Sequence, residues 1–325
     1  MNILVTGGAG YIGSVVAERL LAFGHNALIY DDLSAGHRGA VAAGAELIVG
    51  GLDDGAALAG CMREHKIEAV IHLAAHALVS ESMTNPSMYF RNNVAAGITL
   101  LDAMAACGVK RIVFSSTCAV YGEPEDSPIT EDSRRRPANP YGESKLTFER
   151  LLHWHDVAHG VRYTTLRYFN AAGATGDFGE HHSPETHLIP IVLGCAMGSR
   201  EQVEVFGNDY PTPDGTCVRD YIHVVDIADA HIRALRLLEG GSRTYNLGTG
   251  KGYSVREVIE AARRITGNPI PVQYSPRRPG DPAVLVASSE RIKRELDWQP
   301  GHSGLEEIIE SAWRWHRAHP HGYEH

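Results

Sequence analysis

The chain has 325 residues, of which 43% are hydrophobic and 21% are charged, and its formal net charge is −9. This composition is typical of a globular protein with a large core, and the acidic balance disfavours a nucleic-acid partner. Because no apolar run of about 18 residues and no basic targeting segment is present, we expect a cytoplasmic protein without membrane contact. The five cysteines lack any CxxC spacing, which predicts reduced thiols.

The first predicted element is a short apolar strand, NILVTG at 2–7, which passes directly into a glycine-rich turn and then a helix. Within this turn Gly7, Gly10 and Gly13 have the spacing GxxGxxG. The first glycine permits a tight turn, the second lets the backbone approach a pyrophosphate, and the third lets the helix pack closely on the sheet. The helix N-terminus offers free N–H groups and a partial positive charge to phosphates. The pattern predicts a dinucleotide-binding site.

The second predicted strand, residues 26–30, is followed by Asp31. A carboxylate at this point accepts hydrogen bonds from an adenosine ribose and repels a 2′-phosphate, which predicts NAD as the cofactor instead of NADP. Two alternatives stay open. Asp31 and Asp32 could simply form a turn, and the nearby Arg38 could accommodate NADP.

The chain then alternates between apolar strands and helices. The predicted strands cover 46–50, 68–75, 110–116 and 161–170, and the predicted helices cover 54–65, 87–107 and 141–159. Continuous apolar strands separated by helices predict an α/β fold with a parallel, doubly wound sheet of the Rossmann type.

A smaller α/β lobe is predicted for the second half, which is richer in proline, glycine and loop signals. We expect a dinucleotide-binding domain over residues 1–170 and a substrate-binding lobe over 171–325. A segment near 218–247 is expected to return to the first domain, so that the boundary is discontinuous.

A tyrosine and a lysine share one face of the helix that follows Pro140. Tyr141 and Lys145, in PYGESKLTFERLL, are four residues apart, so the ammonium group can lie near the phenol. Because this spacing also occurs by chance, a surface pair is the alternative. Thr117 follows the strand 110–116 and is predicted at the edge of the sheet where such folds bind ligands.

Several longer strings carry a family resemblance. The strings in the first half are GGAGYIGS (7–14), HLAA (72–75), NNV (92–94), SSTCAVYG (115–122), NPYGESK (139–145) and RYFNAAG (167–173). They resemble the extended short-chain dehydrogenase/reductases. The strings in the second half are ETHLIP (185–190), VFGNDYPTPDGTCVRDYIHVVDIADAH (205–231), YNLGTG (245–250) and RRPGDPA (277–283). They are similar to the UDP-glucose 4-epimerases, and the resemblance covers essentially the whole chain.

This resemblance implies a redox cycle without net oxidation. Tyr141 would take the proton of the sugar 4-hydroxyl while the C4 hydride passes to NAD, and the hydride would return to the opposite face of a 4-keto sugar. To act as a base near pH 7, the tyrosine pKa must fall by about 3 units from its ordinary value near 10. Lys145 and the nicotinamide ring would supply the positive charge, and Thr117 would hydrogen-bond the reacting oxygen.

The resemblance also implies two sets of contact residues and a homodimer. The cofactor set is Gly7, Gly10, Tyr11, Ile12, Gly13, Asp31, Leu52, Leu73, Ala74, Ala75, Asn92, Ser115, Tyr141, Lys145 and Tyr168. The UDP-sugar set is Thr117, Asn170, His187, Leu188, Phe206, Arg219, Arg278, Asp281 and Leu285. In the homodimer, helices near 92–106 and 141–159, with outward apolar residues that include Leu151 and Trp154, would form a four-helix bundle.

Single residues distinguish epimerisation from the reactions of related enzymes. Cys118 and Ala119 replace the Asp-Glu pair that 4,6-dehydratases resembling this chain use to eliminate water, so elimination is disfavoured. A silent NAD-sensing regulator is disfavoured because Tyr141 and Lys145 are both present. UDP-xylose/UDP-arabinose and UDP-N-acetylglucosamine 4-epimerases stay open as alternatives. Leu285 falls where hexose-restricted members carry tyrosine and more permissive members a small residue.

The chain departs from the family's sequence pattern at the adenine site. Many family members have an aspartate after the glycine of the third strand, whereas this chain has Gly51 and Leu52, so adenine binding could move to Asp53.

His155 and His159 have a spacing that could chelate a metal, but no acidic third ligand accompanies them. No metal is predicted.

Overall fold

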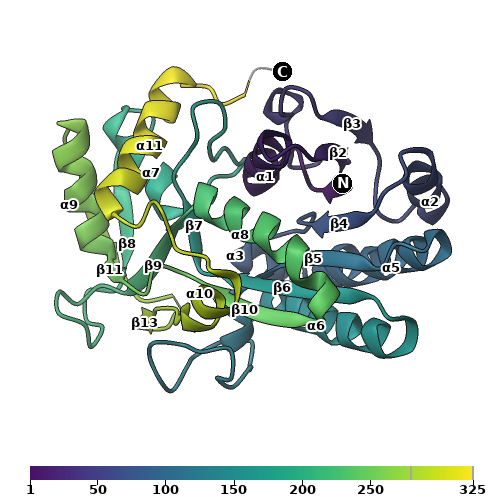
Figure 1. Ribbon diagram of the computed structural model, residues 1–325. Helices are drawn as coiled ribbons and strands as arrows, with labels where there is room; N and C mark the ends of the chain where they lie inside the picture. The colour runs from purple at the N-terminus through teal and green to yellow at the C-terminus, as the bar shows by residue number, and fades with distance from the viewer. Residues whose placement is uncertain (279, 324–325) are drawn as a thin grey trace.

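The computed structural model describes residues 1–278 and 280–323. Its centre is a parallel sheet of seven strands in the order β10-β6-β5-β4-β1-β2-β3 (Figure 1). The strands are β1 Asn2–Thr6, β2 Asn26–Asp31, β3 Glu46–Val49, β4 Ala69–His72, β5 Arg111–Thr117, β6 Arg162–Tyr168 and β10 Arg243–Leu247. The doubly wound α/β fold expected from the sequence is confirmed.

The strands lie at the centre because their apolar side chains are buried on both faces of the sheet. In β1, Ile3 is fully buried and aligns with Ala27 of β2 on one side and with Ala69 of β4 on the other. The chain order therefore reverses at β1, with later strands on both sides of it. In open α/β sheets such a switch point leaves a crevice at the carboxyl ends of the strands.

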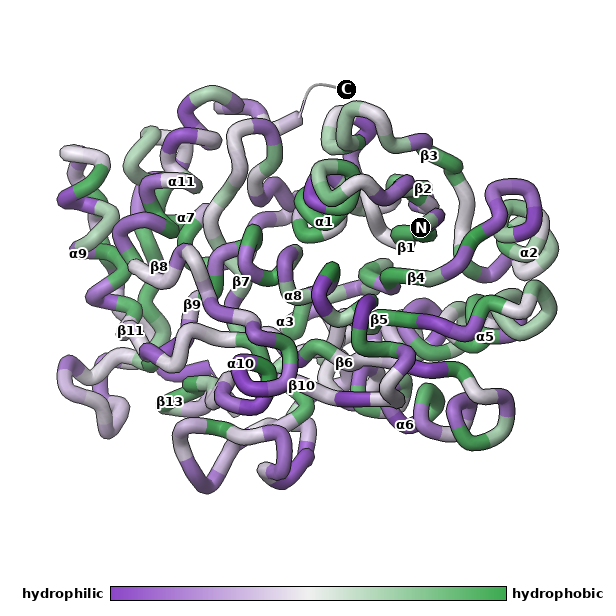
Figure 2. The backbone as a smooth tube through the Cα atoms, in the orientation of Figure 1, coloured by the Kyte–Doolittle hydropathy of each residue, from purple (hydrophilic) through white to green (hydrophobic). Residues whose placement is uncertain are grey.

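Helices cover both faces of the sheet. One face is covered by α1 Tyr11–Ala22 and α8 Val224–Leu237, which pack on each other and on the sheet. The other face is covered by α2 Gly55–Glu64, α5 Ala96–Cys107 and α6 Pro140–His159. Figure 2 shows that β1 and α1, which share one hydrophobic core, carry mainly hydrophobic residues. Because the two faces of the sheet have separate hydrophobic cores, each face needs its own layer of helices.

Two predicted elements are shorter or more broken than expected. The strand expected to reach residue 75 ends at His72, because the N–H groups of Leu73 and Ala74 both donate to the carbonyl of Thr6. The helix expected over 87–107 consists of α4 Pro86–Phe90, a π-helical turn and α5. In the π turn, Asn93 accepts from the N–H of His76 and donates to its carbonyl, which ties the turn to the loop after β4.

A smaller lobe forms around a second sheet. Strand β9 Val218–His223 pairs in parallel with β7 Asn170–Ala172 and β13 Val284–Leu285, and in antiparallel with β11 Gly252–Ser254. A separate parallel pair joins β8 Val203–Phe206 to β12 Val272–Ser275. Helices α7 Leu188–Ala196, α9 Val255–Thr266 and α11 Leu305–Ala318 pack together beside these strands, at the left of Figure 1. The remaining helices are α3 Val79–Thr84 and α10 Glu290–Leu296.

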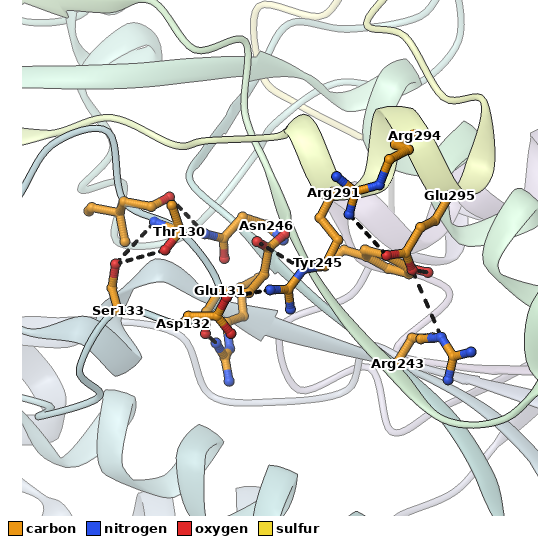
Figure 3. Close-up of polar contacts among 12 residues, drawn as sticks. Thr130, Glu131, Asp132, Ser133, Arg243, Tyr245, Asn246, Arg291, Arg294 and Glu295 are labelled. Carbon is orange, nitrogen blue, oxygen red and sulfur yellow. Dashed lines mark hydrogen bonds and ion pairs between the residues drawn. The ribbon is translucent and has the colours of Figure 1, made fainter.

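The segment 218–247 connects the lobe with the central sheet. It runs through β9, crosses over α1 as α8, and adds β10 beside β6. Polar contacts anchor β10, as Figure 3 shows: the backbone N–H of Asn246 donates to Glu131, and the hydroxyl of Tyr245 donates to Glu295 of α10. Arg291 of α10 forms an ion pair with Glu131 at 3.6 Å. These contacts join α10 and the loop near residue 131 to the last strand of the sheet.

Local sequence signals define the ends of α6. The side chain of Asn139 accepts from the N–H of Gly142 at 2.8 Å, Pro140 occupies the first turn, and Gly160 ends the helix in the left-handed region at φ +66°. Gly142 allows α6 to approach the turn after β5, because a Cβ there would lie 2.6 Å from the carbonyl oxygen of Ala119. The first turn of α6 therefore begins directly beside the end of β5.

A buried ion pair fixes α6 on the sheet. Arg167 of β6 donates two hydrogen bonds to the carboxylate of Glu149, at 2.9 and 2.5 Å, and Ser116 of β5 donates a third at 2.6 Å. The two charged side chains are 2% and 8% exposed. Because only one rotation of α6 about its axis satisfies both strands, Glu149 sets which face of the helix points toward the cleft.

Among the residues that the structure describes, none of the helices combines the length and the apolar character that a membrane span requires.

We predict that Glu149→Gln lowers the free energy of unfolding by about 3–5 kcal/mol, because it leaves the charge of Arg167 buried without a counter-charge. The matched control is Glu306→Gln, which breaks the exposed pair with Arg264 and should cost less than about 1 kcal/mol. Urea denaturation of both variants measures the difference. Equal losses in the two variants would contradict the assigned role of the buried pair.

Candidate active site

A cleft of about 520 Å³ opens at the carboxyl ends of the sheet strands and extends toward the lobe. Its walls come from the loops after β1, β2 and β4, from the end of β5 and the start of α6, and from lobe residues near 187 and 285. The cleft therefore lies at the crevice predicted by the strand order. It brings residues from both halves of the chain together.

The turn after β1 forms one wall, and two of its positions accept only glycine. Gly7 has φ +72°, and a Cβ there would lie 2.5 Å from the backbone nitrogen of Ala74. A Cβ at Gly13 would lie 2.1 Å from the carbonyl oxygen of Gly7. Gly10 caps α1 without any side-chain hydrogen bond, so backbone N–H groups at the helix start are available to an anion.

Asp31 combines a structural role with a place in the cleft. Its carboxylate accepts from the N–H groups of Ala9 at 3.0 Å and Leu33 at 2.9 Å, and the side chain lines the cleft. The aspartate therefore stabilises a turn, as the alternative interpretation expected, and its carboxylate still has lone pairs for further hydrogen bonds. Burial raises its pKa, and the two backbone hydrogen bonds oppose this shift.

Tyr141 and Lys145 of α6 and Thr117 at the end of β5 all line the cleft. The hydroxyl of Thr117 lies within hydrogen-bond reach of the Tyr141 phenol. The ammonium of Lys145 donates a hydrogen bond to the carbonyl of Ser115 at 2.9 Å. The residue as a whole is 4% exposed. Lys145 is buried and Tyr141 is half-buried at the cleft wall, so the two residues do not form an exposed surface pair.

The expected lowering of the tyrosine pKa is not produced by the protein alone. Burial raises the pKa of Tyr141 well above its usual value, and the hydrogen bond with Thr117 opposes this only in part. Burial likewise lowers the pKa of Lys145 to about 7, although Glu149 acts in the opposite direction. The surroundings therefore disfavour both the phenolate of Tyr141 and the ammonium of Lys145.

Most of the predicted cofactor set lines the cleft. The members that line it are Gly7, Gly10, Tyr11, Ile12, Gly13, Asp31, Leu52, Leu73, Ala74, Ala75, Asn92, Tyr141, Lys145 and Tyr168. Ser115 does not line it, because its hydroxyl binds His231 at 2.8 Å and its carbonyl holds Lys145. Asp53, suggested as an alternative adenine contact, is also absent from the walls, whereas Leu52 is present.

The predicted UDP-sugar set divides into two groups. Thr117, Asn170, His187, Leu188, Asp281 and Leu285 line the cleft, whereas Phe206, Arg219 and Arg278 do not. In the second group, Arg219 lies next to the cleft, because it forms an ion pair with the lining residue Asp281. The guanidinium of Arg278 lies 3.8 Å from the ring centroid of Phe206, which is a cation–π geometry.

Sequence reasoning missed several lining residues. They are Asp32, Ser34, Cys118, Asn139, Glu180, His182 and Tyr221, among others. Asp32 and Cys118 directly follow the predicted residues Asp31 and Thr117 at strand ends, so the strand-end rule could have found them. Glu180 and His182 lie in a long loop before α7, and only the folded chain brings this loop to the cleft.

The parallel sheet, its glycine turn and the cleft at the switch point define a dinucleotide-binding α/β enzyme. The family model for the "NAD dependent epimerase/dehydratase family" matches residues 3–248. The chain belongs to this family, which confirms the family expected from the motifs.

Individual relatives are similar over nearly the whole length. A UDP-glucose 4-epimerase of Halalkalibacterium halodurans is 52% identical over 327 aligned positions, which cover 99% of this chain and 98% of that protein. A crystal structure of a UDP-glucose 4-epimerase superposes with a TM-score of 0.98 at 48% identity, covering both chains completely. A UDP-glucose 4-epimerase from Brucella ovis in complex with NAD gives a TM-score of 0.94 at 45% identity, covering 96% of this chain and 97% of that one.

Proposed function

We propose that this chain is an isomerase that interconverts UDP-glucose and UDP-galactose by an NAD-dependent reaction at the sugar C4. The observation that carries the proposal is that Tyr141, Thr117 and Lys145 line the same cleft as the glycine turn, with Thr117 beside Tyr141. A hydroxyl group placed there lies beside both an acid/base phenol and a dinucleotide site.

The cofactor is NAD, and the chain's own groups fit it. Gly7 and the open N-terminus of α1 would hold its pyrophosphate, and Asp31 would accept from its adenosine ribose. Arg38, which left NADP open as an alternative, does not line the cleft. When bound, NAD supplies the hydride acceptor and donor at C4 and a positively charged ring near Tyr141.

Three side chains act on the sugar hydroxyl. Tyr141 takes the proton of the 4-hydroxyl and returns it when the other epimer forms, and Thr117 holds the oxygen by a hydrogen bond. Lys145, fixed by the carbonyl of Ser115, keeps a donor next to this pair in an environment that excludes water. Burial raises the pKa of Tyr141, and the hydrogen bond with Thr117 acts against this shift, so Thr117 favours the phenolate that accepts the proton.

The UDP group is proposed to lie toward the lobe. Asn170, His187 and Leu188 line that side of the cleft, and Asp281 connects it to Arg219. The guanidinium groups of Arg219 and Arg278 suit a diphosphate, because they donate in a planar, bidentate geometry. Binding from this side orients the sugar toward Tyr141.

Tyr141→Phe tests the reaction. It removes only the acid/base oxygen, so kcat should fall by about 10²–10⁴ while bound NAD and the folded structure are retained. The control Tyr163→Phe removes a phenol oxygen outside the cleft and should leave kcat unchanged. The measurement is conversion of UDP-galactose to UDP-glucose by chromatography, with no net NADH formed. A Phe variant with near-full activity would remove Tyr141 from the mechanism.

Substitution of Leu285 tests the sugar selectivity. Leu285 is half-buried, lines the cleft and packs in part against a cluster that includes Phe169. A bulkier side chain in the wall excludes an N-acetyl group, so Leu285→Tyr should abolish activity on UDP-N-acetylglucosamine and spare the activity on the hexoses. Leu285→Ala should raise the activity on UDP-N-acetylglucosamine. The expected change in selectivity is about 10- to 200-fold in kcat/KM. Equal changes for both sugars would mean that Leu285 only packs in the lobe.

We further propose a cytoplasmic homodimer. All five cysteines are free, which suits a reducing compartment. On α6, Trp154 and Val157 are 63% and 66% exposed and lie three residues apart on one face, which supports a contact surface there. The inclusion of Leu151 in this outward set is corrected, because its side chain is half-buried and packs against the core.

Trp154→Glu tests the dimer. Wild-type protein at micromolar concentration should scatter light with about twice the mass of the 35.3 kDa chain, and the variant should shift toward the monomer because a buried charge is costly. Phe23→Glu, at another exposed apolar residue at the end of α1, is the control and should stay dimeric. A monomeric wild type would rule out the assembly.

A further inference from the structure

Four potential metal ligands converge in the loop before α7. The segment EHHSPETH, residues 180–187, contains the pattern Glu-x-His-x-x-Glu-x-His. Glu180, His182, Glu185 and His187 each direct one nitrogen or oxygen atom to a common point, and these four atoms all lie within 4.8 Å of one another. The pattern lies in eight consecutive residues, yet its side chains meet only because the loop folds back on itself.

The nitrogen–oxygen separations in the cluster lie between 2.9 and 3.5 Å. The Nδ1 atom of His187 lies 2.9 Å from an oxygen of Glu180 and 2.9 Å from an oxygen of Glu185. The Nδ1 atom of His182 lies 3.5 and 3.4 Å from oxygens of the same two carboxylates. Ligands bound tetrahedrally to zinc at about 2.0–2.1 Å lie about 3.3 Å apart. The observed separations lie on both sides of this value.

Hydrogen bonding alone does not satisfy the cluster. The Nδ1 atom of His182 is buried and has no hydrogen-bond partner within the described part of the chain, and its distances to the carboxylates are those of adjacent ligands.

The surroundings also orient the ligands. Glu185 accepts from the backbone N–H groups of Thr186 and His187, each at 2.8 Å, so its carboxylate is fixed by its own loop. Such secondary hydrogen bonds are typical of metal sites. Glu180, His182 and His187 all line the cleft, and His187 immediately precedes α7.

We propose that Glu180, His182, Glu185 and His187 bind one zinc-type divalent metal ion at the wall of the cleft. Two imidazole nitrogens and two carboxylate oxygens suit zinc, whereas magnesium and calcium favour six or more oxygen ligands. The two carboxylates balance the charge of the ion. The metal braces the loop against the start of α7, and this inference does not depend on the proposed reaction.

Cobalt provides a direct spectroscopic test on the full chain. Protein treated with EDTA and dialysed is titrated with Co²⁺, which absorbs strongly in the visible region when its ligands are tetrahedral and weakly when they are octahedral. We expect strong bands that saturate at one Co²⁺ per chain and disappear when Zn²⁺ is added. Weak octahedral bands only, or no saturation at one equivalent, would overturn the proposal.

Variants localise the ion. His182→Gln and Glu185→Gln keep the side-chain size, and each should weaken Co²⁺ binding at least about tenfold, because loss of a ligand costs no less than loss of an outer partner. The matched control is His159→Gln, an exposed histidine on α6 outside the cluster, which should bind as the wild type does. Unchanged binding in the cluster variants, with circular dichroism confirming their fold, would overturn the assignment, as would loss in the control.

Discussion

The buried ion pair between Glu149 and Arg167 is the constraint on which the site depends. It joins α6 to β6, and Ser116 extends the contact to β5. Lys145 lies one turn before Glu149 on the same helix, so the rotation that satisfies the ion pair also turns Lys145 toward the end of β5. A buried charge is costly when its partner is lost, which makes this orientation stringent.

The site therefore uses burial for two purposes that oppose each other. Apolar surroundings lower the local dielectric around the buried Lys145 and beside the half-buried Tyr141, which strengthens the electrostatic interactions there. The same surroundings raise the pKa of Tyr141 and lower that of Lys145 to about 7.

The two halves of the chain meet around this centre. The segment 218–247 belongs to both, since β9 builds the lobe and β10 completes the central sheet. Contacts of Asn246 and Tyr245 with the loop near Glu131 and with α10 hold the last strand in place (Figure 3). The lobe wall of the cleft is consequently attached to the sheet that carries Thr117. The two walls of the cleft are therefore parts of one structure.

The sequence by itself determined the doubly wound sheet, the glycine turn, Asp31 and the Tyr141–Lys145 pair, because these depend on local periodicity and on residues at strand ends. Only the tertiary structure decided that Ser115 lies behind the cleft, that Arg219 is paired with Asp281, and that Leu151 faces the core. It also decided the meeting of the carboxylates and imidazoles of 180–187. The first three features depend on side-chain directions and on contacts between segments far apart in the chain, and the cluster depends on how its own loop folds back, which the local sequence pattern does not specify.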